Sequence, residues 1–104
     1  YKRQGWRGRD TRPDRTVSDR ALAWTAEGWE DYLYWQTQDR KTLRRINLLI
    51  TDILRDDPFE GIGKPEALKH ALAGAWSRRI DEANRLVYIA NDTHVTILQA
   101  RYHY

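Results

Sequence analysis

The chain ends on the sequence RYHY, in which His103 lies between Tyr102 and Tyr104. Further charged side chains lie in the second half of the chain: Lys64, Glu66, Lys69, His70, Arg78, Arg79 and Arg85. Together they offer a carboxylate, an imidazole, several cations and aromatic rings. That set suits metal-free RNA cleavage, in which a base deprotonates the 2′-hydroxyl, an acid protonates the 5′-oxygen and cations stabilise the phosphorane. The rings can stack unpaired bases.

Glu66 and His103 have natural roles in such a reaction. A glutamate is ordinarily ionised at neutral pH and can act as the base. The terminal carboxylate next to His103 favours a protonated imidazole, which can act as the acid. Each residue also has an ordinary structural reading, such as an exposed terminal histidine or a glutamate in the first turn of a helix. On residue types and spacing alone, a general α+β binding module ranks above a ribonuclease site.

Capping residues and hydrophobic spacing predict the elements of the first half of the chain. The apolar stretch 21–25 is typical of a strand, and a helix is expected over 26–38 with Thr25 as its N-cap. Asp39 can cap a second amphipathic helix, which the Asp-Pro pair at 57–58 would end because a residue before proline avoids helical geometry.

The second half of the chain begins with a segment, 57–74, that is rich in turn-forming residues. Pro65 indicates a short helix through Leu72. Three strands are expected at 75–81, 85–91 and 94–104, joined by links short enough for hairpins. The predicted fold class is α+β, in the order β-α-α-β-β-β, with a twisted antiparallel sheet packed against the two N-terminal helices.

Hairpin pairing determines which side chains meet at the end of this sheet. Antiparallel pairing of 85–91 with 94–104 places Arg85 beside His103. Alternation along the last strand predicts one face made of Val95, Ile97, Gln99, Arg101 and His103. A register slip of one residue would exchange the two faces.

Composition limits the classes of protein that fit. The 104 residues suit one domain, without cysteine and without an apolar run near the ~20 residues that cross a bilayer. Residues 1–20 carry seven basic and three acidic side chains, whereas 21–104 carry 11 basic and 12 acidic ones. We therefore expect a basic arm at 1–20, either a native extension or a cloning remnant, and a nearly neutral domain at 21–104. Three scattered histidines make a structural metal site unexpected.

Four motifs in order carry a family resemblance: DYLYWQ, PFEGIGKPEALKHALAGAWSRRI, RLVY and the terminal RYHY. Over residues 21–104 the chain resembles the YoeB toxins of the RelE superfamily. The resemblance implies a cytoplasmic toxin of a type II toxin–antitoxin system, an endoribonuclease that cleaves mRNA in the ribosomal A site. It also implies a YefM-like antitoxin, a homodimer, the 70S ribosome as partner, operator DNA bound only through the antitoxin, and no metal, cofactor or membrane.

The resemblance also implies roles for individual residues. Glu66 is the expected general base, His103 the general acid, and Arg85 the residue that stabilises the transition-state phosphate. Tyr104 is expected to place the substrate. Lys69 and Arg79 are expected to engage the scissile phosphate and the RNA backbone. From their expected place at the same end of the sheet, and not from the resemblance, Lys64, Arg78 and Tyr102 are further expected RNA contacts.

Two other functions share this architecture. A ParE-like toxin would act by binding DNA gyrase, and a purely regulatory subunit would act only by binding its antitoxin as a co-repressor. The combination of Glu66, Arg85 and His103 favours the nuclease over the first. The nearly neutral domain argues against strong DNA binding by the toxin alone.

Overall fold

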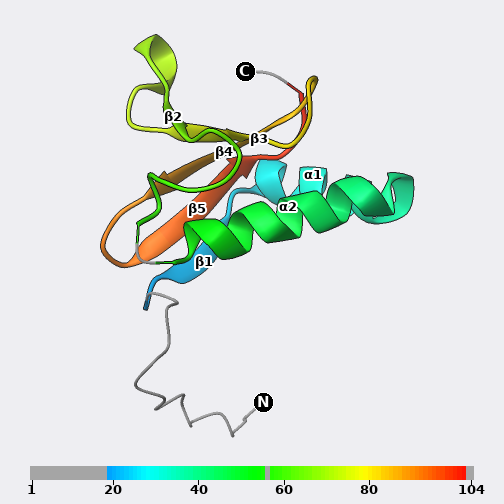
Figure 1. Ribbon diagram of the computed structural model, residues 1–104, viewed down its shortest axis with the longest axis horizontal. Coiled ribbons are helices and arrows are strands. Elements are labelled where there is room, and N and C mark those ends of the chain that lie inside the picture. Colours follow the sequence, from blue (N-terminus) through cyan, green and yellow to red (C-terminus); the bar gives the residue numbers. More distant parts are fainter. Residues whose placement is uncertain (1–18, 56, 103–104) are drawn as a thin grey trace, which may run out of the picture.

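A computed structural model of the chain describes residues 19–55 and 57–102. His103, the expected general acid, and Tyr104 lie outside these ranges. The predicted arm also lies outside them, except for residues 19–20. The elements are β1 (Ala21–Trp24), α1 (Ala26–Gln38), α2 (Arg40–Ile53), β2 (Glu66–Ala67), a 3-10 turn (His70–Leu72), β3 (Trp76–Arg79), β4 (Arg85–Ala90) and β5 (His94–Gln99). In Figure 1, α2 lies along one side of the sheet, and β1 and β2 lie at opposite ends of it.

Both predicted helices and their N-caps are confirmed. The Thr25 hydroxyl accepts a hydrogen bond from the Gly28 N–H at 3.0 Å. The Asp39 carboxylate accepts from the Lys41 and Thr42 N–H groups at 3.0 and 3.3 Å. These oxygens satisfy helix N–H groups that have no partner within the helix. The second helix ends at Ile53, earlier than predicted: Leu54 caps it, and the loop 58–62 that follows is bonded to Arg78 on β3.

The sheet has the strand order β1-β5-β4-β3-β2. The predicted antiparallel meander is confirmed for β3, β4 and β5. The predicted α+β fold class is confirmed, with one correction to the antiparallel sheet: β1 pairs in parallel with β5. Parallel neighbours need a long crossover connection, and the helical layer that follows β1 provides it.

The segment after Pro65 does not form the predicted helix. Glu66 and Ala67 instead pair with Ser77 and Trp76 as a short antiparallel edge strand. A proline with fixed φ can begin a strand as well as a helix, and backbone pairing with β3 decides between the two. Only the last residues of the predicted helix are helical, in the 3-10 segment His70–Leu72.

The last strand also ends before its predicted end. A register shift at Val87/Tyr88 gives β5 one extra residue opposite β4, so that Tyr88 pairs with Ile97 but Val87 pairs with Gln99. Gln99 therefore shares the face of Val87 and not the face of Ile97, which corrects the predicted alternation. Beyond β5 the chain leaves strand geometry, and Tyr102 has a φ of 67°.

The main core lies between the helices and one face of the sheet. Its buried members are Trp35, Ile46, Leu49, Ile50, Ile53, Ile80, Leu86, Tyr88, Val95, Ile97 and Ala100. A Cβ on Gly28 would collide with the Ile97 carbonyl, so glycine is what lets α1 approach β5 so closely. A smaller cluster of Leu68, Ala75 and Val87, with Leu72 and Leu98, covers part of the other face. Within the described ranges, no helix is long and apolar enough to cross a bilayer.

Candidate functional site

One row of side chains crosses the sheet face that points away from the helices. Residues directly opposite each other on antiparallel strands share a face. The pairs Glu66–Ser77, Ser77–Val87 and Val87–Gln99 therefore align four side chains across β2, β3, β4 and β5. Glu66 at the edge is exposed, whereas Ser77 and Val87 beside it are 1% exposed. The row therefore places the Glu66 carboxylate beside a small buried area of the sheet.

Two arginines lie on the same face, two residues further along β3 and β4. Arg79 and Arg85 stand opposite each other on β3 and β4. Arg79 is a diagonal neighbour of Glu66, a relationship that puts Cβ atoms within ~8 Å. The Arg85 guanidinium donates to the Asp81 and Asn84 carbonyls at 2.9 and 3.3 Å. A carboxylate and two cations predicted as site residues thus meet on one face.

The two predicted lysines flank Glu66. Lys64 is exposed and follows Gly63, whose carbonyl accepts a hydrogen bond from the Arg79 N–H at 2.7 Å. Lys64 has a φ of 54°, a left-handed conformation that costs energy for a side-chain-bearing residue and persists where neighbouring contacts hold it. Lys69 is exposed and precedes the 3-10 turn. Both cations border the edge strand that carries the proposed base.

The predicted proximity of Arg85 to the C-terminal segment is confirmed as far as Tyr102. The Arg85 N–H donates to the Tyr102 carbonyl at 3.0 Å. The Tyr102 N–H donates to Asn84 Oδ1 at 2.6 Å. These two bonds hold Tyr102 in its left-handed conformation, with its side chain 60% exposed. The proposed acid His103 and the terminal Tyr104 follow directly but lie outside the described residues.

Helix α1 holds the segment that leads to this terminus. The Trp35 Nε1–H donates to the Ala100 carbonyl at 2.8 Å, and the Ala100 N–H donates to Asp31 Oδ2 at 2.9 Å. The Arg101 guanidinium lies 3.5 Å from the Tyr34 ring centroid and 4.5 Å from that of Tyr102, within the range of a cation–π contact. Main-chain and ring contacts thus fix the chain up to Tyr102.

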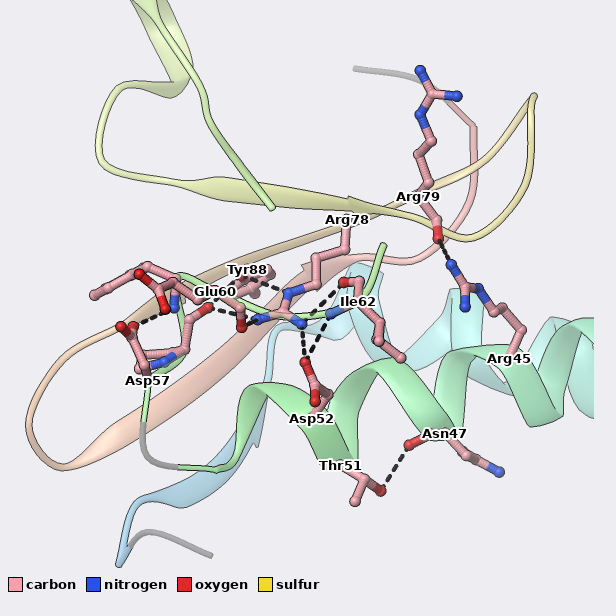
Figure 2. Close-up of polar contacts among 12 residues, drawn as sticks. Arg45, Asn47, Thr51, Asp52, Asp57, Glu60, Ile62, Arg78, Arg79 and Tyr88 are labelled. Atoms are coloured by element: carbon pink, nitrogen blue, oxygen red, sulfur yellow. Dashed lines mark hydrogen bonds and ion pairs between the residues drawn. The ribbon is translucent and has the colours of Figure 1, made fainter. Parts of the chain in front are cut away.

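Arg78 does not belong to this exposed face. Its side chain is fully buried on the helix side of the sheet, and its guanidinium forms an ion pair with Asp52 at 2.5 Å (Figure 2). A guanidinium has five N–H groups, and five hydrogen bonds to protein oxygens engage them. This geometry corrects the prediction that Arg78 contacts RNA.

Two neighbours of Arg78 have shifted pKa values. Burial by itself opposes ionisation of Asp52, but hydrogen bonds from Arg78 and Ile62, together with the positive guanidinium, outweigh it and lower the pKa of the carboxyl. Burial raises the pKa of the Tyr88 phenol, although the Arg78 hydrogen bond opposes the rise. Asp52 is therefore a carboxylate and Tyr88 a neutral phenol at neutral pH.

Sequence reasoning missed three residues that hold the site: Asp52, Tyr88 and Asn84. One signal was available for Arg78 and its partners. Arg78 has the same parity along β3 as Trp76 and Ile80, which contact the main core, so alternation places it inward. An inward arginine requires an acidic or carbonyl partner. For Asn84 no comparable signal exists, because its role depends on the turn at Tyr102.

Among the described residues, no three His, Asp or Glu side chains lie close enough together to hold a metal ion. The exposed face carries a carboxylate, several cations and an exposed aromatic ring. These groups can move a proton and attract a phosphate.

Solved structures with the same architecture define the class of protein. A YoeB dimer from Staphylococcus aureus superposes with a TM-score of 0.77 at 42% identity, covering 84% of this chain and 100% of that one. A heterotetrameric YoeB–YefM toxin–antitoxin complex from the same species gives 0.75 at 44% identity, covering 82% and 98%. The fold is that of a bacterial toxin from a toxin–antitoxin system.

Sequence comparison narrows the class to a family. The family described as YoeB-like toxin of bacterial type II toxin–antitoxin system matches residues 24–104. Toxin YoeB of Streptomyces coelicolor is 58% identical over 83 residues, which are 80% of this chain and 98% of that protein. The chain therefore belongs to the YoeB-like toxin family, which confirms the resemblance drawn from the motifs.

Proposed function

We propose that this protein is a ribosome-dependent endoribonuclease that cleaves mRNA in the A site and thereby stops translation. The observation that supports the proposal is that Glu66, Arg79 and Arg85 share one sheet face, at the end where Tyr102 is bonded to Arg85. No cofactor enters the proposed reaction.

Each group on the face has a role in the proposed reaction. Glu66, exposed at the edge of the sheet, takes the proton of the 2′-hydroxyl. His103 gives a proton to the departing 5′-oxygen, and Arg85 stabilises the charge that builds on the phosphate. Tyr104 places the substrate.

The remaining cations and ring bind the RNA around the scissile bond. Lys64, Lys69 and Arg79 neutralise backbone phosphates. All three are exposed around Glu66, so RNA can reach them. The exposed ring of Tyr102 offers a flat surface on which a splayed base can stack.

The family relationship also suggests partners. Related toxins have been solved as a dimer and in complex with YefM. We propose that this chain forms a homodimer, that a YefM-like antitoxin holds it inactive in the cytoplasm, and that operator DNA is bound only through the antitoxin. Ribosomes and mRNA would be engaged after the antitoxin is lost.

Cleavage on translating ribosomes with mapped mRNA ends tests the proposal. The Glu66→Gln variant should lose cleavage by on the order of 10²- to 10⁴-fold, as expected for loss of a general base. Its fold should be intact because the side chain is exposed. The matched control is Glu60→Gln, which changes an exposed glutamate whose main-chain carbonyl binds Arg78. Equal cleavage by both variants would refute the role of Glu66.

The same preparations separate the alternatives. If no cleavage is seen with the wild-type chain and gyrase supercoiling is inhibited, the protein acts by binding, like a ParE toxin. If neither activity is found and the antitoxin complex alone represses its operator, the protein is a regulatory subunit.

A further inference from the structure

The Arg78 guanidinium is enclosed by the loop 58–62 together with one side chain from α2 and one from β4. The five acceptors are Asp52 Oδ2, the Tyr88 hydroxyl and the main-chain carbonyls of Pro58, Glu60 and Ile62. The three carbonyls lie two residues apart and all turn toward one side chain, at 2.9–3.1 Å. Figure 2 shows the guanidinium between this loop and the end of α2. Residues 58–62 thus take their shape from a side chain on β3.

Further contacts tie the same loop to Arg78. The Tyr88 hydroxyl, which accepts from Arg78 Nε, donates to the Pro58 carbonyl at 2.6 Å. Asp52 Oδ2, which pairs with Arg78, also accepts from the Ile62 N–H at 3.1 Å. A Cβ on Gly61 would collide with Asp52 Oδ2 and lie 3.0 Å from Arg78 Nη1. The loop is therefore shaped closely around the ion pair.

This loop ends where the proposed base begins. Gly63 follows Ile62, and its carbonyl accepts from the Arg79 N–H at 2.7 Å. Glu66 then pairs with Ser77. The residues on either side of Arg78 thus bond the backbone that carries Glu66, while the Arg78 side chain bonds the loop before it on the opposite face of the sheet.

We propose that Arg78 is a positioning residue, whose enclosed ion pair with Asp52 sets the place of Glu66 relative to Arg79 and Arg85 by fixing loop 58–62. This inference rests on the proposed function, because it assigns Arg78 to the action of Glu66. Arg78 itself touches no substrate, since it is fully buried and all its N–H groups are bonded within the protein.

Lysine at position 78 is the informative substitution. Arg78→Lys keeps a positive charge for Asp52 but has three N–H groups on one nitrogen, which cannot reach five acceptors arranged around a planar guanidinium. The exposed Arg44 on α2 provides the matched control, Arg44→Lys. Tyr88→Phe is a milder second variant, because it leaves the ion pair and removes one hydroxyl from the enclosure.

A double-mutant cycle distinguishes positioning from general support of the fold. Single-turnover cleavage on ribosomes is measured for Arg78→Lys in the wild-type and Glu66→Gln backgrounds. If Arg78 acts through Glu66, the rate falls on the order of 10- to 100-fold in the first background and less than about 3-fold in the second. Substrate affinity should change little. An equal loss in both backgrounds, or no loss in either, overturns the inference.

Amide hydrogen exchange tests the loop independently of activity. In Arg78→Lys and Tyr88→Phe, exchange should accelerate at Ile62, which bonds Asp52, and at Leu68, whose N–H bonds the Ala75 carbonyl just beyond β2. Exchange within α2 should stay as in Arg44→Lys. Unchanged exchange at both amides overturns the inference. If the wild-type chain does not cleave mRNA, the proposed function fails, and these amides still decide whether Arg78 fixes the segment carrying Glu66.

Discussion

Arg79 on β3 and Arg85 on β4 stand directly opposite each other on the exposed face of the sheet. Like charges in this relationship destabilise a sheet by up to ~1 kcal/mol. The Arg85 guanidinium relieves part of this by donating to two hairpin carbonyls. Two cations kept together at a cost in stability are expected where an anion binds.

Removing one of these charges should therefore raise stability and lower activity. We expect Arg79→Gln to increase the free energy of unfolding by about a few tenths of a kcal/mol at low salt, because the cations are exposed and screened. Added sulfate should stabilise the wild type more than the variant in thermal unfolding. The control Arg44→Gln removes an exposed charge on the helix layer. An Arg79→Gln protein that cleaves mRNA at the wild-type rate would contradict the account.

Gly61 and Gly74 provide a matched pair for testing the loop around Arg78. Both have positive φ, at 128° and 96°, so alanine is strained at each. Only Gly61 is crowded, because its added Cβ would meet Asp52, whereas nothing lies within 4 Å at Gly74. Gly61→Ala should cost about 1–3 kcal/mol more than Gly74→Ala in urea unfolding. Equal costs would show that the loop accommodates the added methyl group, and would contradict its close packing around Arg78.

The Asp52–Arg78 ion pair predicts acid sensitivity. The hydrogen bonds and positive charge around Asp52 outweigh burial and lower its pKa in the folded protein. Such a group contributes stability that is present above its unfolded pKa, near 3.8, and lost as pH falls through the folded value. Asp52→Asn should cost about 1–3 kcal/mol at neutral pH. Its stability should fall less steeply than wild type below pH 3.8; parallel pH curves would rule this out.

Trp35 is expected to support activity from the far side of the sheet. Trp35→Phe removes the donor to the Ala100 carbonyl and leaves that buried oxygen without this bond. The loss should cost about 1–3 kcal/mol in unfolding. It should also slow cleavage, since Ala100 begins the segment that reaches Tyr102. Trp29→Phe, at an exposed position on the same helix, is the control, and equal effects of the two changes would count against this role.

The helices could be predicted because their signals are local. Thr25 and Asp39 cap as expected, and the apolar stripe of α2 forms the core that its spacing indicates. The antiparallel meander followed from short links between strand-like stretches. The same short links predict that Arg85 lies next to the C-terminal segment, and its bond to Tyr102 confirms this.

The features that could not be predicted depend on contacts between distant segments. The predicted alternation of side chains between the two faces does not hold past Ile97, because the register shift opposite Val87 adds one residue to β5. The edge strand at Glu66 required its partner Ser77, which no local pattern in the PEAL segment reveals. Alternation along β3 places Arg78 inward, but its acceptors could not be identified, because three of the five are main-chain carbonyls of a remote loop and carbonyls have no sequence signature.

The most direct test of the proposed reaction removes one oxygen atom from the substrate. Ribosomes are programmed with an mRNA in which a single A-site nucleotide, at the mapped cut, carries 2′-deoxyribose. The proposed attack by the 2′-hydroxyl predicts that cleavage at that bond disappears with the wild-type protein and that the unmodified mRNA yields a 2′,3′-cyclic phosphate or its 3′-phosphate product. Cleavage of the 2′-deoxy bond at an undiminished rate would contradict the mechanism in which Glu66 deprotonates that hydroxyl.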